Sequence, residues 1–192
     1  YGTDLTGCSN AVTSFDSPPV PLEKLVHIEP MGKMAGEGGH ITPTDHLYIK
    51  AISTGPNSVP VLAIADGYLV QIGEQSGGED PLDFRVVIEH SCSLFSWYIH
   101  LETFSEPILK QITLSQSGNW FGRVPVKSGE TIGYVGYLHP YQKGFNLEAD
   151  DFDWAVSDTD TLLNGFIIPD HYLAEPWKIH MVDPFDYYAE PL

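Results

Sequence analysis

Two neighbouring runs of the sequence decide its fold class: Phe84–His90, which reads FRVVIEH, and Leu94–Leu101, which reads LFSWYIHL. Both runs are rich in β-branched and aromatic residues, which favour extended strands. The short polar segment Ser91-Cys92-Ser93 joins them. We therefore expect two successive strands in this part of the chain.

Similar short runs occur on either side of this pair. A hairpin is predicted where Asp66-Gly67, a turn signal, separates Val59–Ala65 from Tyr68–Ile72. Residues 102–119 are the best candidate for a helix. Further strands are expected at Leu47–Ile52, Thr131–Gly136 and Phe152–Val156. Short strands separated by turn residues indicate a mainly β domain.

Composition limits the classes of partner. Hydrophobic residues make up 42% of the 192 residues, which is enough for a buried core. The formal net charge of -17 would repel nucleic acid and anionic lipid, so we expect neither as a partner. No run of eighteen apolar residues occurs, which excludes insertion in a membrane by a helix. The acidity indicates either solubility or the binding of divalent cations.

The chain divides into three expected parts. Residues 1–39 read as an N-terminal arm with a Gly-rich loop, because Ser17–Pro21 contains three prolines and cannot form a regular helix. Residues 40–160 form the β core. Residues 161–192 are an aromatic C-terminal extension that we expect to pack on the core. The arm and the extension could also dock neighbouring copies in an oligomer.

Export is expected, although the signals leave alternatives open. The chain begins at Tyr1, which is compatible with a removed leader or with a trimmed chain. Cys8 and Cys92 could form one disulfide, as in exported proteins, or remain two buried thiols. We expect an extracellular or cell-envelope location.

Four segments together resemble the lysostaphin-type zinc endopeptidases. They occur in the order typical of that family, at Pro60–Val70, Val86–His90, Trp97–Leu101 and Val126–Gly136. The resemblance covers a little over half of the chain. It implies the duplicated hybrid motif fold, a β-sandwich or barrel core. It also implies peptides of the cell envelope as substrates.

The resemblance further implies a zinc site, which this sequence matches only in part. In the family, an H-x-x-x-D motif and the last residue of an H-x-H pair hold the metal, and other histidines assist a zinc-bound water. His46 stands at the first position, but Lys50 replaces the required Asp. Asp151-Phe152-Asp153 stands where the H-x-H pair is expected, and His100 is in place.

Two interpretations of this site follow. In the favoured one, Lys50 is a cation that fills the place of the metal and pairs with Asp153 or Asp151, because a protonated lysine repels zinc. In the other, His46 and Asp153 hold a metal, and His100 and Asp151 act in catalysis. A shifted register could instead recruit His40 and Asp45 as ligands.

The favoured function is that of an exported, non-catalytic, peptidase-like domain. It would bind a peptide or glycan of the cell envelope, another extracellular polymer or a partner protein, and no cofactor is expected. One alternative is an active zinc endopeptidase that cleaves peptidoglycan cross-links, with zinc as its cofactor. The other is a structural subunit of an extracellular assembly.

Overall fold

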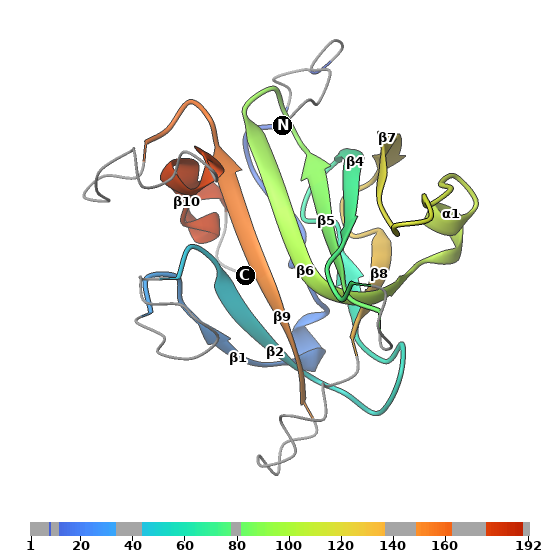
Figure 1. Cartoon of the computed structure of the whole chain (residues 1–192). Coiled ribbons are helices and arrows are strands. Elements are labelled where there is room, and N and C mark those ends of the chain that lie inside the picture. Colours follow the sequence, from blue (N-terminus) through green and yellow to red (C-terminus); the bar gives the residue numbers. More distant parts are fainter. Residues whose placement is uncertain are drawn as a thin grey trace.

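The architecture is a single extended network of antiparallel strands (Figure 1). A computed structural model describes residues 8, 12–33, 44–77, 82–136, 149–162 and 176–189. The strands are β1 (Leu25–Glu29), β2 (Leu47–Ile52), β3 (Pro60–Leu62), β4 (Gly67–Glu74), β5 (Phe84–Glu89), β6 (Leu94–Phe104), β7 (Trp120–Val126), β8 (Thr131–Val135), β9 (Ala149–Asp158) and β10 (Met181–Val182). The helical turns are η1 (Leu22–Lys24), α1 (Glu106–Leu109), η4 (Pro176–His180) and η5 (Pro184–Tyr187).

The strands follow the order β1-β2-β9-β6-β5-β4-β7, with β8 joining β3 to β6 and β10 pairing with β9. Within the described ranges, all pairs of neighbouring strands are antiparallel, so the predicted mainly β class is confirmed. None of the helices in the described part of the chain has the length and apolar content needed to cross a bilayer.

The helix expected over residues 102–119 is wrong for most of its length. Strand β6 continues to Phe104 because Thr103 and Phe104 pair with Tyr134 and Gly133 of β8. Helix α1 covers only four residues, Glu106–Leu109, and its one fully buried side chain is Ile108. Strand pairing and burial therefore override the weak helical pattern of this segment.

The predicted hairpin at Asp66-Gly67 is also wrong. Strand β3 pairs with β8, whereas β4 pairs with β5 and β7. The Asp66 carboxylate accepts hydrogen bonds from Ser128 N at 2.9 Å and from Lys127 Nζ at 2.6 Å. These hydrogen bonds hold the bend at Asp66-Gly67 against the segment between β7 and β8. The Asp-Gly signal marks a local bend correctly, but it does not determine which strands become neighbours.

Strand β9 shows how the sequence divides the two faces of the sheet. Phe152, Trp154 and Val156 are fully buried in the main hydrophobic core. The alternate residues Asp151 and Asp153 project on the opposite face, because successive side chains of a strand point in opposite directions. The polar residues of the predicted site therefore share one face of β9.

A smaller apolar cluster extends along this second face. It contains Val70, Val87, Trp97, Ala155 and Met181. The ring of Trp177, in η4, stacks on Trp97 with the ring centroids 5.9 Å apart. Residues of the predicted C-terminal extension thus contact the same face as the candidate site. The predicted boundaries at residues 39 and 160 stay predictions.

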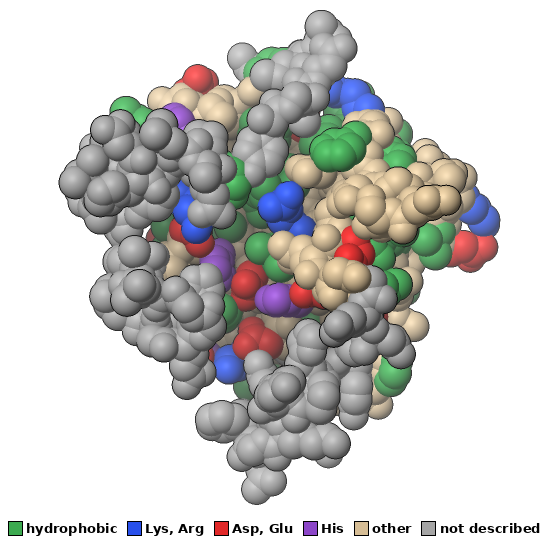
Figure 2. Space-filling view, viewed as in Figure 1, with side chains coloured by type: hydrophobic (Ala, Val, Ile, Leu, Met, Phe, Trp, Pro, Cys, Tyr) green, Lys and Arg blue, Asp and Glu red, His purple; other side chains and the backbone are tan. Residues whose placement is uncertain are grey.

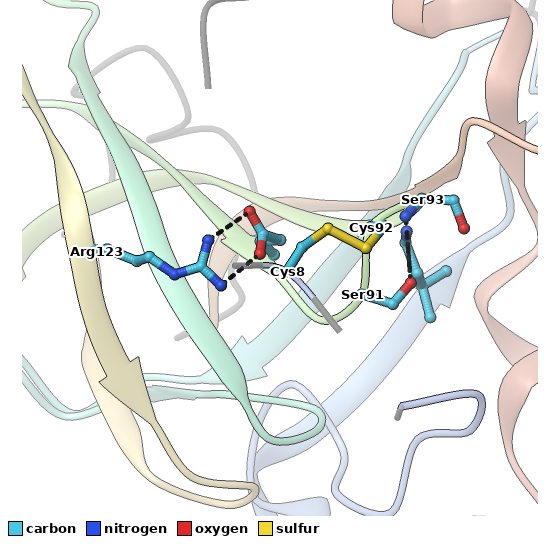
Figure 3. The surroundings of a disulfide bond; sticks show 7 residues. Cys8, Ser91, Cys92, Ser93 and Arg123 are labelled. Carbon is cyan, nitrogen blue, oxygen red and sulfur yellow. Dashed lines mark hydrogen bonds and ion pairs between the residues drawn. A yellow bond between two sulfur atoms is a disulfide. The ribbon is translucent and has the colours of Figure 1, made fainter. Parts of the chain in front are cut away.

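The N-terminal segment is tied to the core covalently and by packing. Of the two alternatives for the cysteines, the structure has the disulfide between Cys8 and Cys92 (Figure 3). Further along, Phe15 forms an isolated bridge with Tyr188, and its ring lies 5.3 Å from that of Tyr187. A disulfide is consistent with an oxidising environment outside the cytosol.

Candidate functional site

The pairing of β2 with β9 brings four of the predicted site residues onto one face. Lys50 lies directly opposite Asp151, and Tyr48 lies opposite Asp153. His46 immediately precedes β2 and lies four positions before Lys50, an even offset, so the two side chains share a face. The antiparallel register therefore places His46, Lys50, Asp151 and Asp153 side by side.

A β-bulge in β6 adds His100 to this face. Tyr98 and Leu101 pair with Val86 and Phe84 of β5, so two residues of β6 oppose one residue of β5 at this point. Tyr98 and Leu101 are both fully buried although they are three residues apart, which an unbroken alternation would not allow. The extra residue is accommodated by His100, whose φ of 73° lies in the left-handed region. Such strained backbone is concentrated at functional sites.

The site is a row of alternating carboxylates and imidazoles. Asp153 Oδ2 lies 3.2 Å from His46 Nε2 and 3.5 Å from His100 Nε2. On the outer sides, Asp45 Oδ1 lies 2.8 Å from His46 Nδ1, and Asp83 Oδ2 lies 2.9 Å from His100 Nδ1. Figure 2 shows histidine and acidic side chains next to one another near the centre of this face.

The carboxylates favour the protonated form of both imidazoles. Burial opposes protonation of His100, but hydrogen bonds to Asp153 and Asp83 outweigh it and raise its pKa to about 10. Burial likewise opposes protonation of His46, yet the hydrogen bond to Asp45 and the charge of Asp153 raise its pKa. Burial also disfavours the charged form of Asp45, but the His46 hydrogen bond and Lys178 lower its pKa. The acidic groups between and beside the two imidazoles thus favour the cationic form of each.

Lys50 lies at the end of this row and is shared by two carboxylates. Its Nζ is 3.6 Å from Asp151 Oδ2 and 3.7 Å from Glu29 Oε1, so it links β1, β2 and β9. Burial raises the pKa of Asp151 to about 6, despite the opposing charge of Lys50, and the neighbouring Asp153 adds to the rise. Lys50 therefore stabilises a carboxylate that its surroundings otherwise disfavour.

The structure brings together most of the residues singled out from the sequence. His46, Asp153 and His100 meet directly, and Asp45 contacts His46. Of the two partners predicted for Lys50, the structure pairs it with Asp151. His40 lies outside the described residues.

Two members of the site were not identified from the sequence. Asp83 lies 17 residues before His100 in the chain, and Glu29 belongs to a segment that was expected to be an arm. No local pattern relates either residue to its partner. Only the strand register could have revealed them.

The residues present do not reproduce the zinc arrangement that the resemblance implies. A catalytic zinc requires three protein ligands around one open position. Here an ammonium group stands where that arrangement needs a carboxylate, and it is engaged by Asp151 and Glu29. Within the described ranges, no group of three or more His, Cys, Asp or Glu residues is arranged to hold a metal ion.

Comparisons with known proteins identify similar folds. No protein-family model matches the chain. No curated protein matches it either. Among solved structures, it is similar to a zinc-containing peptidase from Vibrio cholerae (TM-score 0.45, 18% identity, 77% of this chain and 37% of that one). It is also similar to Csd3 from Helicobacter pylori (TM-score 0.49, 15% identity, 94% of this chain and 36% of that one). A third similar structure is the catalytic domain of lysostaphin from Staphylococcus simulans (TM-score 0.47, 16% identity, 84% of this chain and 90% of that one).

These likenesses concern the fold alone. The chain spans little more than a third of the length of the Vibrio and Helicobacter proteins. At identities of 15 to 18%, they give no information about activity. This mainly β chain is similar in structure, at low identity, to lysostaphin-type zinc peptidases.

Proposed function

We propose that this chain is a non-catalytic, peptidase-like domain that binds a peptide of the cell envelope outside the cytoplasm. The observation that carries the proposal is the position of Lys50. Its ammonium group occupies the strand position at which the resemblance requires a metal ligand, within 4 Å of both Asp151 and Glu29. A fixed positive charge there opposes the binding of a second cation.

The row of ion pairs supports the same proposal. A metal would require neutral imidazoles at His46 and His100, and Asp153 would have to exchange its imidazole contacts for a metal bond. The carboxylates on both sides favour the protonated imidazoles, so they oppose this exchange. The Cys8–Cys92 disulfide is consistent with a location outside the cytosol.

Metal content tests the proposal directly. The purified protein is incubated with zinc, dialysed and measured by elemental mass spectrometry, beside Lys50→Asp and the control Lys110→Asp. Lys110 is an exposed residue whose partner is Glu106, so the control makes the same change of charge outside the site. We expect no stoichiometric zinc in the unmodified protein or in the control. Zinc in Lys50→Asp alone would support the interpretation that Lys50 fills a former metal position.

Binding and turnover separate the remaining functions. Purified peptidoglycan sacculi are sedimented with the protein, and the supernatant is analysed for released peptides with and without a chelator. Co-sedimentation without release is the expected result. Stoichiometric zinc in the unmodified protein, with release that the chelator abolishes, would overturn the proposal in favour of a zinc endopeptidase. Self-association without any affinity for sacculi would instead favour the structural subunit.

A further inference from the structure

Arg85 lies beside the candidate site, on the same face of the sheet. It belongs to β5, and the Ile99–His100 bulge of β6 stands opposite it. Its guanidinium carbon lies 5.6 Å from the centroid of the Trp97 ring. Across the sheet, Arg85 pairs with Gly73 of β4. The guanidinium lies close to this glycine, since a Cβ atom built there would be 3.6 Å from Arg85 Nη2. Arg85 is thus held between an aromatic ring and a position without a side chain.

Arg123, the only other arginine of the chain, contacts both an aromatic ring and a carboxylate. Arg123 lies over the ring of Tyr68, with its guanidinium carbon 4.1 Å from the ring centroid. It also forms a forked ion pair with the buried Glu89, with contacts of 2.8 Å and 3.2 Å (Figure 3). Planar, two-pronged pairing with a carboxylate is the interaction for which a guanidinium is best suited.

Arg85 has the aromatic contact but no carboxylate. Within the described residues, no Asp or Glu oxygen lies within ion-pairing distance of its guanidinium, although the chain has 26 acidic residues. Its Nε is buried and has no hydrogen-bond acceptor in that part of the chain. Most of the other described cations, including Lys33, Lys50, Lys127 and Lys178, contact a carboxylate. Buried donors are normally hydrogen-bonded, so the unused Nε–H of Arg85 in so acidic a protein indicates a role in binding.

We propose that Arg85 binds the carboxylate of a peptide ligand, which supplies the partner that Glu89 supplies to Arg123. This inference rests on the proposed function and names the ligand group that the site recognises. The net charge of -17 disfavours anions in general. A carboxylate that binds must therefore be attracted by a local cation that is not already paired. Arg85 meets this requirement next to the row containing His100.

A peptide fits this position better than an acidic sugar. Sugars stack on open aromatic faces, but only 8% of Trp97 is exposed, and its ring contacts both Trp177 and Arg85. Asp83 immediately precedes β5, two residues before Arg85, and its carboxylate contacts His100 of the candidate site. The Oδ1 atom of Asp83 is a buried acceptor without a donor among the described residues, which suits a peptide N–H.

The two arginines allow a direct test by NMR. The Nε–H region of a ¹⁵N-labelled sample contains one signal for each arginine, and the variant Arg85→Gln assigns them. Acetyl-triglycine with a free carboxylate is titrated into the protein, beside its C-terminal amide and glucuronate. We expect the Arg85 signal to shift with the free acid only, while the Arg123 signal stays in place. No shift, an equal shift with the amide, or a larger shift with glucuronate would each overturn the proposal.

Affinity gives a second readout with a matched control. Arg85→Gln should weaken binding of the free acid at least about tenfold, because a charge-assisted forked pair is lost. The control is Lys24→Gln, which removes the same charge from a residue beside β1, four strands away in the sheet order. It should leave the affinity unchanged. Equal losses in both variants would show a general charge effect and contradict the proposal.

The sacculus experiment separates this inference from the proposed function. If the free acid shifts the Arg85 signal but sacculi do not bind, the carboxylate site stands and the proposed polymer is wrong. If sacculi bind to the unmodified protein and to Arg85→Gln equally, the proposed function stands and the carboxylate site is wrong. Sacculi whose carboxyl groups have been converted to amides should bind only as weakly as the Arg85→Gln variant binds native sacculi.

Discussion

Lys50 of β2 and Asp151 of β9 are direct neighbours across the sheet, with Nζ and Oδ2 3.6 Å apart. The lysine lies at the place of a metal ligand in the family that the sequence resembles, and the aspartate at the place of a histidine of the H-x-H pair. A pair of opposite protein charges therefore stands where the resemblance expects two neutral or anionic groups around a cation.

Asp151→Asn should stabilise the protein at neutral pH. Burial raises the pKa of Asp151 to about 6, above its ordinary value of 3.8, so the folded state binds a proton that the unfolded state has released. This carboxyl therefore lowers stability progressively as the pH rises from about 4 to about 6. Urea unfolding at pH 7.5 should show a gain on the order of 1–3 kcal/mol.

The gain should disappear at about pH 4, where the carboxyl is largely protonated in the folded state. Comparison of the two proteins at the same pH removes the contributions of all other titrating groups. A variant that is less stable than the parent protein at pH 7.5 would show that the pair with Lys50 outweighs the effect of burial.

The charge states of His100 and His90 should differ at neutral pH. The pKa of His100 is raised to about 10 by Asp153 and Asp83 against the effect of burial, whereas burial lowers the pKa of His90 to about 4. Imidazole ¹⁵N spectra at pH 7 should therefore show a protonated His100 and a neutral His90. His90 is held by Ser96 Oγ at 2.8 Å and the Asp66 carbonyl at 3.0 Å.

Asp83→Asn should lower the pKa of His100 and leave the His90 spectrum unchanged. Because the folded-state pKa of His100 is raised, its stabilising contribution is complete below about pH 6.5 and is lost as the pH rises towards 10. The destabilisation caused by Asp83→Asn should consequently be larger at pH 6 than at pH 10. An unchanged His100 titration in the variant would remove Asp83 from the site.

His100→Gly should be more stable than His100→Ala, by about 1 kcal/mol. Both variants lack the imidazole, so their difference reports the backbone strain at a φ of 73°. Thr103, in the same strand, provides the control, since its φ is not positive and glycine there should be less stable than alanine. Urea unfolding of the four variants measures both differences. A preference for alanine at both positions would show that the bulge is not strained.

Arg123→Met should destabilise the protein by about 3–5 kcal/mol, because it leaves the buried Glu89 carboxylate without its forked partner. The double variant Glu89→Gln with Arg123→Met should recover a large part of this loss, since no buried charge remains. Denaturant unfolding of the single and double variants gives both values. A double variant as unstable as Arg123→Met would show that packing over Tyr68, rather than the charge pair, is the dominant contribution.

The sequence by itself determined the strands and the faces that they present. Leu47–Ile52 is a strand with the predicted bounds, and the alternation in β9 separates Phe152 and Trp154 from Asp151 and Asp153 before any tertiary contact is known. Period-two patterns are local properties, so they can be recognised in a single chain. The resemblance to the lysostaphin-type family likewise identified His46, Lys50 and His100 as candidates.

Only the tertiary structure decided which of these groups meet. The pairing of β3 with β8, the bulge at His100, and the contacts of Asp83 and Glu29 all depend on register between strands that are distant in the sequence. The same holds for Arg85. The tertiary structure shows that it contacts an aromatic ring, as Arg123 does, but lacks a carboxylate partner like Glu89 among the described residues. Long-range pairing is selected by the burial of whole faces, which no local pattern encodes.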